Sequence, residues 1–239
     1  VNTAIGELAM GSVDNDNSDN NTAVGFNALR GGSGALSFCT ALGTYALDTT
    51  AHHNHTGSTA IGGKALEDLT SGTGNTAVGY EAGKDMTTAE DCTIIGYQAG
   101  LDAGSRSTLV GKNAGGAITS GGFNNTCVGK DAGDTITSGD WNTVIGMGAD
   151  VSAAGATNQT VLGYIAAGVG DNQISLGNTN VTAINAQVTS ITAYSSDERT
   201  KKDISDYDVN GLGFINELQL KKYVYKNPAD YPDEIRHEK

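Results

Sequence analysis

Two side chains near the C-terminus have the types and the spacing of a nucleophile and its base. Ser196 supplies a hydroxyl, and Lys201 follows it five residues later. A lysine takes a proton from a serine only when desolvation or a neighbouring cation lowers its pKa, and Arg199 and Lys202 are cations close in sequence. The alternative interpretation is a lysine-rich loop without chemistry. The choice between them depends on what precedes the serine.

The chain of 239 residues is acidic, with 27 Asp and Glu against 14 Lys and Arg and a net charge of −13. Eight of the basic residues lie in residues 195–239, close to the serine and lysine. An acidic surface argues against binding to nucleic-acid backbones and to anionic membranes. No apolar run approaches the roughly 18 residues of a membrane span, and no signal peptide is visible. Because Val1 falls inside a repeat, we expect the natural N-terminus to lie upstream.

Most of the chain before the serine is one repeat anchored on glycine. The glycines recur every 14 to 19 residues, and the pattern around each is x-T-A-[VIL]-G-x-x-A. Threonine stands three residues before the glycine in ten of eleven copies, and alanine stands three after it in ten. An aliphatic residue directly precedes the glycine in all eleven. The aligned glycines are Gly6, Gly25, Gly43, Gly62, Gly79, Gly96, Gly111, Gly129, Gly146, Gly163 and Gly177.

A unit of about 17 residues fits one coil of a solenoid and is too short for a helix pair or a propeller blade. We expect each coil to place its aliphatic residue inward, its threonine in a ladder of stacked strands, and its alanine where neighbouring backbones approach. Polar stretches such as residues 14–20 and 119–124 are expected to be surface loops. One aliphatic residue and one alanine per coil make a thin core for a single chain. We therefore expect chains to associate laterally.

The expected fold is all-β, a trimeric parallel β-roll or β-solenoid about 50 Å long, followed by the start of a small α+β domain. The repeat is similar to the head repeats of trimeric autotransporter adhesins, which form a left-handed β-roll; this sequence mostly has Thr for their Ser, and longer coils. The eleventh copy carries Ile174 for Thr and Asn180 for Ala, which indicates a terminal cap. A strand-like neck is expected after it, with the β-branched residues Val181, Ile184, Val188 and Ile191.

The segment from Ser196 onward resembles a known family. Ser196, Asp197, Arg199 and Lys201, with Ile204 after them, match S-D-x-R-x-K at the start of the intramolecular chaperone domain that ends many phage tail fibres and tailspikes, endosialidases among them (peptidase family S74). The likeness continues loosely through Phe214, Ile215, Leu218 and residues 223–226. That family cuts its own backbone directly before the serine. The resemblance therefore implies Ser196 as nucleophile, Lys201 as its partner, and cleavage between Ser195 and Ser196.

The domain organisation that follows is a repeat shaft over residues 1–177, a neck over 178–195, and the start of the chaperone domain over 196–239. Within the last part we expect a turn and short strand at 196–210, a helix at 211–219 and a strand at 221–226. The family's domain is usually two or three times longer and finishes in a long helix, so we expect the domain to be incomplete in this sequence.

Three of the four histidines lie in residues 52–55. In a trimer, His53 and His55 would present six imidazoles around an axis, as H-x-H motifs do in some phage fibre tips. We favour a solvated loop and expect no metal and no other cofactor. Residues 14–20 alternate carboxylates and amides like the first half of a calcium loop, but they lack its later glycine and closing glutamate. No specific calcium site is expected there.

The three cysteines, Cys39, Cys92 and Cys127, are interpreted as small buried residues rather than a disulfide framework or a metal set. Trp141 and Phe123 lie on loops between repeats. We expect both rings to pack on a neighbouring chain; the alternative is stacking on sugar rings.

The functional expectation is a virion structural protein, the distal shaft of a homotrimeric phage tail fibre or spike with an auto-cleaving trimerisation chaperone. Its partners would be other virion tail proteins and a bacterial surface receptor, a glycan or outer-membrane component, with no nucleic acid and no membrane insertion. Enzymatic activity would be at most single-turnover self-cleavage before Ser196. One alternative is the head of a bacterial trimeric surface adhesin, located on the cell surface. A less favoured one is a polysaccharide-degrading tailspike, which needs paired carboxylates in a groove.

Overall fold

The computed structural model describes residues 1–184 except for residues 14–17, 32–33, 50–54 and 120. The chain divides after Ile184 into two units, and the second, Asn185–Lys239, lies outside the described residues. The expected helix and strands after Ser196 therefore remain predictions. Among the described residues there is no helix, and hence none long and apolar enough to cross a membrane. The part of the chain that is described is all-β, as predicted.

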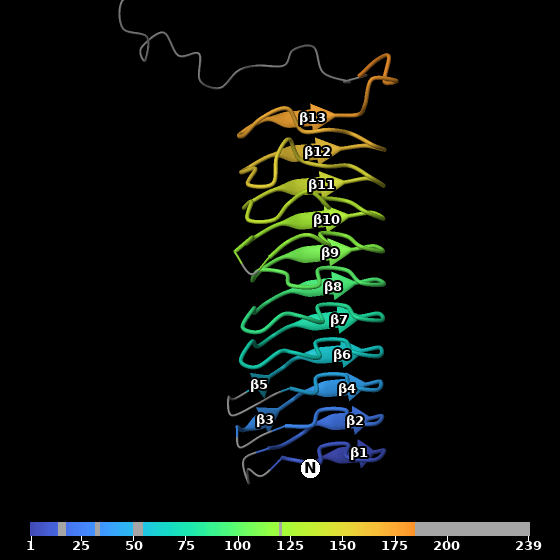
Figure 1. The fold of residues 1–239 in the computed structure, drawn as a ribbon, viewed down its shortest axis with the longest axis vertical. Coiled ribbons are helices and arrows are strands. Elements are labelled where there is room, and N and C mark those ends of the chain that lie inside the picture. Colours follow the sequence, from blue (N-terminus) through green and yellow to red (C-terminus); the bar gives the residue numbers. More distant parts are fainter. Residues whose placement is uncertain (14–17, 32–33, 50–54, 120, 185–239) are drawn as a thin grey trace, which may run out of the picture. The chain divides into compact units, whose positions relative to one another are not determined.

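The first unit is a parallel β-solenoid in which each coil contributes one short strand to a long sheet (Figure 1). The eleven strands of this sheet follow the order β1-β2-β4-β6-β7-β8-β9-β10-β11-β12-β13. Their bounds are β1 Thr3–Ile5, β2 Thr22–Val24, β4 Thr40–Leu42, β6 Thr59–Ile61, β7 Thr76–Val78, β8 Thr93–Ile95, β9 Thr108–Val110, β10 Thr126–Val128, β11 Thr143–Ile145, β12 Thr160–Leu162 and β13 Ile174–Leu176. Two further strands, β3 Leu36–Ser37 and β5 His55–Thr56, form a separate parallel pair.

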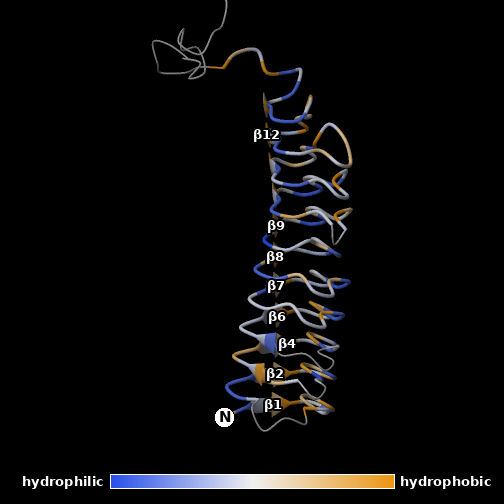
Figure 2. Cartoon of the chain, turned by 90° about the vertical axis from the view of Figure 1, so that its left-hand side faces the viewer, coloured by the Kyte–Doolittle hydropathy of each residue, from blue (hydrophilic) through white to orange (hydrophobic). Residues whose placement is uncertain are grey.

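The register of the sheet reproduces the alignment on glycine. Thr76 pairs with Thr93, and Thr93 pairs with Thr108, so the threonines form one continuous column. The coils stack in a single column when the solenoid is viewed from the side (Figure 2). The repeat period predicted from the sequence is therefore confirmed coil by coil.

The conserved glycines occupy a place where no side chain fits. Gly111 has a φ of 137°, and a Cβ built on it would lie 2.4 Å from the carbonyl oxygen of Gly129 in the next coil. Gly129 N–H donates to the Val110 carbonyl oxygen at 2.8 Å, which holds these two coils at this distance. Both the backbone conformation and the close approach of the next coil therefore require glycine here.

The prediction that the aliphatic residue before each glycine faces inward is wrong. In β8 the middle residue Ile94 is 0% exposed, whereas Ile95 is 39% exposed. Successive side chains of a strand point to opposite faces, so the threonine and the aliphatic residue, two positions apart, share the outer face. The inward side chain is the middle one in each strand. The buried middle residues are Ala23, Ala41, Ala60, Ala77, Ile94, Leu109, Cys127, Val144 and Val161.

The core is also thicker than the repeat motif predicted. The alanine three residues after the glycine is buried, as expected, for example Ala82 and Ala114. Two further rows, four and seven residues after the glycine, add large side chains, and the sequence analysis missed both. Their buried members include Leu29, Leu47, Leu66, Leu69, Met86, Ile118 and Ile136. A thin core is therefore not a reason for chains to associate.

A buried polar column runs beside this core, four residues before each glycine. The Asn125 Oδ1 atom accepts hydrogen bonds from the backbone N–H (3.0 Å) and the Nδ2 atom (3.1 Å) of Asn142. Asn125 Nδ2 donates to the Gly139 carbonyl oxygen at 2.7 Å. Asn142 Oδ1 accepts in turn from the Gln159 backbone N–H at 3.0 Å. Because a buried amide is costly unless its polar atoms are paired, this column fixes the entry of each strand.

Candidate functional site

The residues predicted to carry out self-cleavage lie outside the described residues. Ser195, Ser196, Asp197, Arg199 and Lys201 all fall in the unit after Ile184. Their mutual geometry is therefore a prediction from sequence alone. The neck is described only in part: Val181 and Ile184 are exposed and lie in no strand, which differs from the strand-like neck expected. Val188 and Ile191 lie outside the described part.

The outer side of the long sheet is an exposed feature that runs through all eleven strands. We call the first and third side chains of its eleven strands the outer strip. It consists of the threonines and aliphatic residues of the repeat, with Ile174 in the threonine position of β13. Its large exposed members are Ile5 (61%), Leu42 (46%), Ile95 (39%), Ile145 (41%), Ile174 (70%) and Leu176 (47%). No position of the strip carries a charge.

A row of aromatic side chains borders the strip just after the conserved glycines. Tyr80 and Tyr97, on successive coils, stack with ring centroids 5.6 Å apart. The Lys112 ammonium lies 5.6 Å from the centroid of the Tyr97 ring. Phe26 and Tyr45 form an edge-on pair at 5.3 Å. These contacts between coils pack one face of several rings against protein, and they extend the apolar surface of the strip at its edge.

Trp141 and Phe123 lie at the other end of the strands, in the segments that lead into them. The Trp141 residue is 59% exposed and Phe123 is 36% exposed. Trp141 N–H donates to the Phe123 carbonyl oxygen at 3.1 Å, so consecutive coils hold the two backbones side by side. Packing on a neighbouring chain, the prediction made for both rings, stays a prediction.

The remaining sequence candidates divide between buried and undescribed positions. His55 is 0% exposed in β5, with its Nε2 atom 2.7 Å from the Thr70 carbonyl oxygen, so it is not part of a solvated loop as predicted. His53 lies outside the described residues. No group of three or more His, Cys, Asp or Glu suited to a metal ion occurs in the described part. In the acidic stretch only residues 18–20 are described, and the Asp19 carboxylate pairs with the N-terminal amine of Val1 at 3.0 Å.

All three cysteines are buried and free of disulfides, as predicted. Cys127 is the inward residue of β10, and burial raises the pKa of its thiol to about 12. Cys39 and Cys92 stand in the polar column, where other coils carry Asn, Ser or Gln. The backbone N–H of Cys92 donates to Asn75 Oδ1 at 3.0 Å. These two positions are therefore small and buried, as predicted, and they belong to the polar column, which the sequence analysis did not identify.

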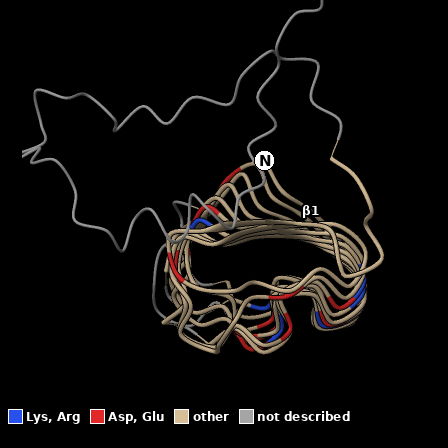
Figure 3. Cartoon of the chain, turned by 90° about the horizontal axis from the view of Figure 1, so that it is seen from above, with Lys and Arg blue, Asp and Glu red and all other residues tan. Residues whose placement is uncertain are grey.

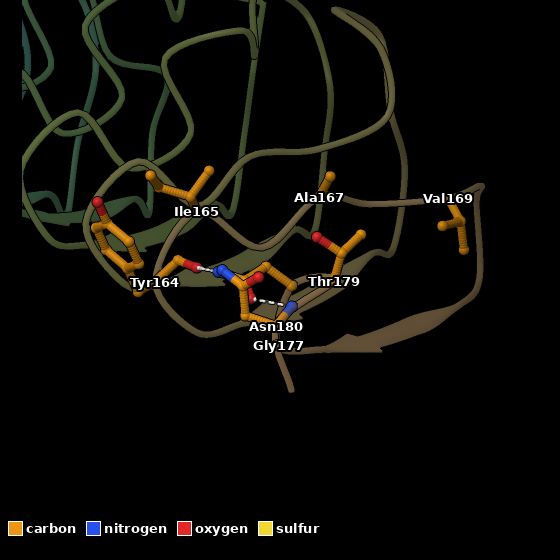
Figure 4. A pocket seen from close by; sticks show the side chains of 8 residues that line it. Tyr164, Ile165, Ala167, Val169, Gly177, Thr179 and Asn180 are labelled. Carbon is orange, nitrogen blue, oxygen red and sulfur yellow. Dashed lines mark hydrogen bonds between the residues drawn. The ribbon is translucent and has the colours of Figure 1, made fainter. Parts of the chain in front are cut away.

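A hollow of about 700 Å³ lies at the C-terminal end of the solenoid (Figure 4). Tyr164, Ile165 and Val169 line one side, and the segment from Gly177 to Asn180 lines the other. The Asn178 Nδ2 atom donates to the Tyr164 carbonyl oxygen at 2.7 Å and ties the two sides together. The lining contains no carboxylate, so this hollow lacks the paired acids that a polysaccharide hydrolase uses.

One pair of carboxyl groups does interact on the surface. The Asp150 carboxylate accepts hydrogen bonds from the backbone N–H of Thr135 (3.1 Å) and of Val151 (2.8 Å). Asp134 is an exposed residue, but partial burial of its carboxyl raises its pKa, and the hydrogen bond to Asp150 and the charge of that residue raise the pKa further.

This pair predicts a pH dependence of stability. The pKa of Asp134 is higher in the folded protein than in the unfolded protein, so the folded protein binds more protons at pH values between the two pKa values. The free energy of unfolding therefore falls as the pH rises through this range. Asp134→Asn should therefore raise the melting temperature at pH 7 and leave it unchanged below about pH 3, where both forms are neutral. Thermal melts at both pH values measure this.

The matched control is Asp171, whose pKa is lowered by hydrogen bonds from the Thr157 backbone and from Gln159. Asp171→Ala should lower the melting temperature at pH 7, the opposite sign. An Asp134→Asn protein that melts at or below the parent temperature at pH 7 would contradict the raised pKa of Asp134.

Comparison with known proteins bears on the second unit. The sequence model of one protein family, Peptidase S74, described as the chaperone of endosialidase, matches residues 196–238. The match begins at the serine singled out by its spacing from a lysine. No match was found among curated proteins.

Proposed function

We propose that this chain is a shaft segment of a homotrimeric phage tail fibre or tailspike that attaches the virion to a bacterial surface. The segment from Ser196 onward begins an intramolecular chaperone that guides assembly and then cuts itself off. The observation that carries this proposal is the order of the chain: a parallel β-solenoid whose last strand ends at Leu176 is followed by a chaperone-of-endosialidase match from residue 196.

A physical argument links the two parts. Eleven nearly identical coils pair in one register, and a shift by a whole coil would satisfy almost the same contacts. A solenoid of this kind benefits from a separate unit that sets the alignment of chains at one end before the coils propagate. A chaperone fused at the C-terminus of the solenoid supplies such a starting point, and the mature shaft has no further use for it.

The assembled shaft presents a rigid, acidic surface in which catalytic groups do not recur from coil to coil. This favours recognition of a surface receptor over turnover of a substrate. The other partners in the proposal are the remaining proteins of the virion tail. The receptor is a bacterial glycan or an outer-membrane component.

The chaperone role is tested by expressing the full-length precursor beside a version that stops after Ser195. The precursor should give soluble protein with three times the mass of one chain by light scattering. The shortened version should give mostly insoluble protein, whereas a shaft released from the precursor after assembly should stay soluble and trimeric. A shortened chain that assembles to the same mass in the same yield would overturn the proposed chaperone role.

A further inference from the structure

The outer strip is too large and too continuous to be an ordinary solvent-facing surface. Aliphatic side chains stand at the same position in all eleven strands, and several are exposed by 39–61%. Single exposed apolar residues are normal on a monomer, but long contiguous rows of them mark interaction surfaces. The alternation within each strand assigns these side chains to the outside, so the coils of the described unit do not cover them.

Charge points to the same surface. The chain carries a net charge of −13, so two copies repel each other through most of their surfaces. Viewed along the solenoid, Lys, Arg, Asp and Glu lie on the turns and loops, and none lies along the side that the sheet forms (Figure 3). Copies of this chain can therefore approach through the strip without bringing like charges together.

The period of the strip restricts the partner. Its rows repeat once per strand, about every 4.8 Å, over eleven strands. A surface that fills the grooves between the rows along their whole length must have the same axial repeat. Another copy of this chain, aligned parallel and in register, has the same axial repeat because it contains the same eleven strands.

The area of the outer strip is comparable to that of a stable protein–protein interface. The three positions of each strand cover on the order of 500 Å² per chain, taking 3.3 Å per residue and 4.8 Å per coil. The position after the glycine adds an aromatic ring in four coils, those of Phe26, Tyr80, Tyr97 and Tyr164. A standard stable interface buries about 800 Å² on each partner. The strip with its aromatic border is thus large enough to hold copies together.

We infer that the outer strip is the surface through which copies of this chain pack against one another, parallel and in register. The inference rests on the proposed assembly into a homotrimer and names the residues that form it. The threonines and aliphatic residues of the repeat face the neighbouring copies, while each chain keeps its own separate core behind them. The aliphatic residue of each coil thereby packs between chains, not within one.

Two neighbouring isoleucines of β8 allow a matched test. Ile95→Asp places a carboxylate in the strip, and Ile94→Asp places one in the chain's own core. Light scattering should show the mass of the Ile95→Asp protein falling from three chains to one, with association weakened at least 100-fold and the far-UV circular dichroism of the strands retained. Ile94→Asp should lose the circular dichroism. Thr88→Asp, exposed and outside the strip, should match the parent in both measurements.

A cross-linking experiment covers the case in which Ile95→Asp fails to fold. In parallel copies packed through the strip, Ile95→Cys brings equivalent thiols together, so oxidation should give covalent dimers on a non-reducing gel. Thr135→Cys should give none, and the natural cysteines are at most 1% exposed and do not compete. If the parent is trimeric but the Ile95 variants neither lose mass nor cross-link, the strip is not the interface. A monomeric parent would overturn the trimer and the interface together, whereas a dimeric parent with the same sensitivity would overturn only the threefold order.

Discussion

The full-length precursor is expected to break between Ser195 and Ser196, and Ser196→Ala is expected to stop the break completely. In the expected reaction the Ser196 hydroxyl would attack the Ser195 carbonyl carbon, the peptide C–N bond would break, and an ester would form while the Ser196 amino group becomes free. Water would then hydrolyse the ester, leaving a carboxylate on Ser195 and the hydroxyl on Ser196. Lys201→Ala removes the base and should slow the reaction by about 10²- to 10⁴-fold, the usual contribution of a general base.

Ser195→Ala is the matched control, because Ser195 contributes only its carbonyl group and the alanine variant should still be cut. Intact-protein mass spectrometry of the four proteins over time measures all of this. Cleavage that persists in the Ser196→Ala protein at the parent rate would exclude Ser196 as the nucleophile. A precursor that stays intact in its assembled state would leave the motif a structural role.

Gly111→Ala is expected to destabilise the solenoid severely. The added Cβ would lie 2.4 Å from the Gly129 carbonyl oxygen, and the backbone at φ 137° is one that side chains rarely adopt. The strained conformation alone costs on the order of 1–3 kcal/mol, and the clash with fixed backbone adds to it. If copies assemble as proposed, the cost recurs in every chain.

Gly121→Ala is the control for this prediction, because a Cβ at Gly121 meets nothing within 4 Å. That variant should unfold at the same denaturant concentration as the parent, whereas Gly111→Ala should unfold at a clearly lower one or fail to fold. Chemical denaturation followed by circular dichroism compares the two. Equal stability of the two variants would mean that the coils do not stack through this glycine.

The period of the fold could be read from the sequence because one position admits a single residue type. The glycine column sets the register, and the threonines around it then fall into line, as Thr93 does between Thr76 and Thr108. The direction of the side chains was harder. A strand of only three residues shows one alternation, which is too short to tell the inner from the outer face. In addition, the middle residue, which faces the core, is a small alanine in four of the five copies from Gly25 to Gly96, so it does not look like a core position. The burial of Ile94 beside the exposed Ile95 resolves it.

The core itself escaped the sequence analysis because its volume is shared between rows. Where the inward strand residue is Ala60, the position four after the glycine is Leu66. Where the strand carries Leu109, the facing position is Gly100, and a Cβ there would lie 2.4 Å from the Leu109 Cδ1 atom. Neither row carries large side chains throughout, so neither stands out alone. The self-cleavage residues were predicted from their spacing and resemblance, and their arrangement in space is outside the described residues.

The hydrogen bonds between coils run along the stack, as from Gly79 N–H to the Ile61 carbonyl oxygen at 2.8 Å. A force that pulls the two ends of the shaft apart would therefore act along these hydrogen bonds and break them one coil at a time. It would not load the bonds of all coils simultaneously in shear. Each coil that gives way releases about 17 residues, roughly 55 Å of extended chain. A fibre fixed to a cell and tugged by flow would lengthen in such steps from an end, and each step would spare the remaining coils.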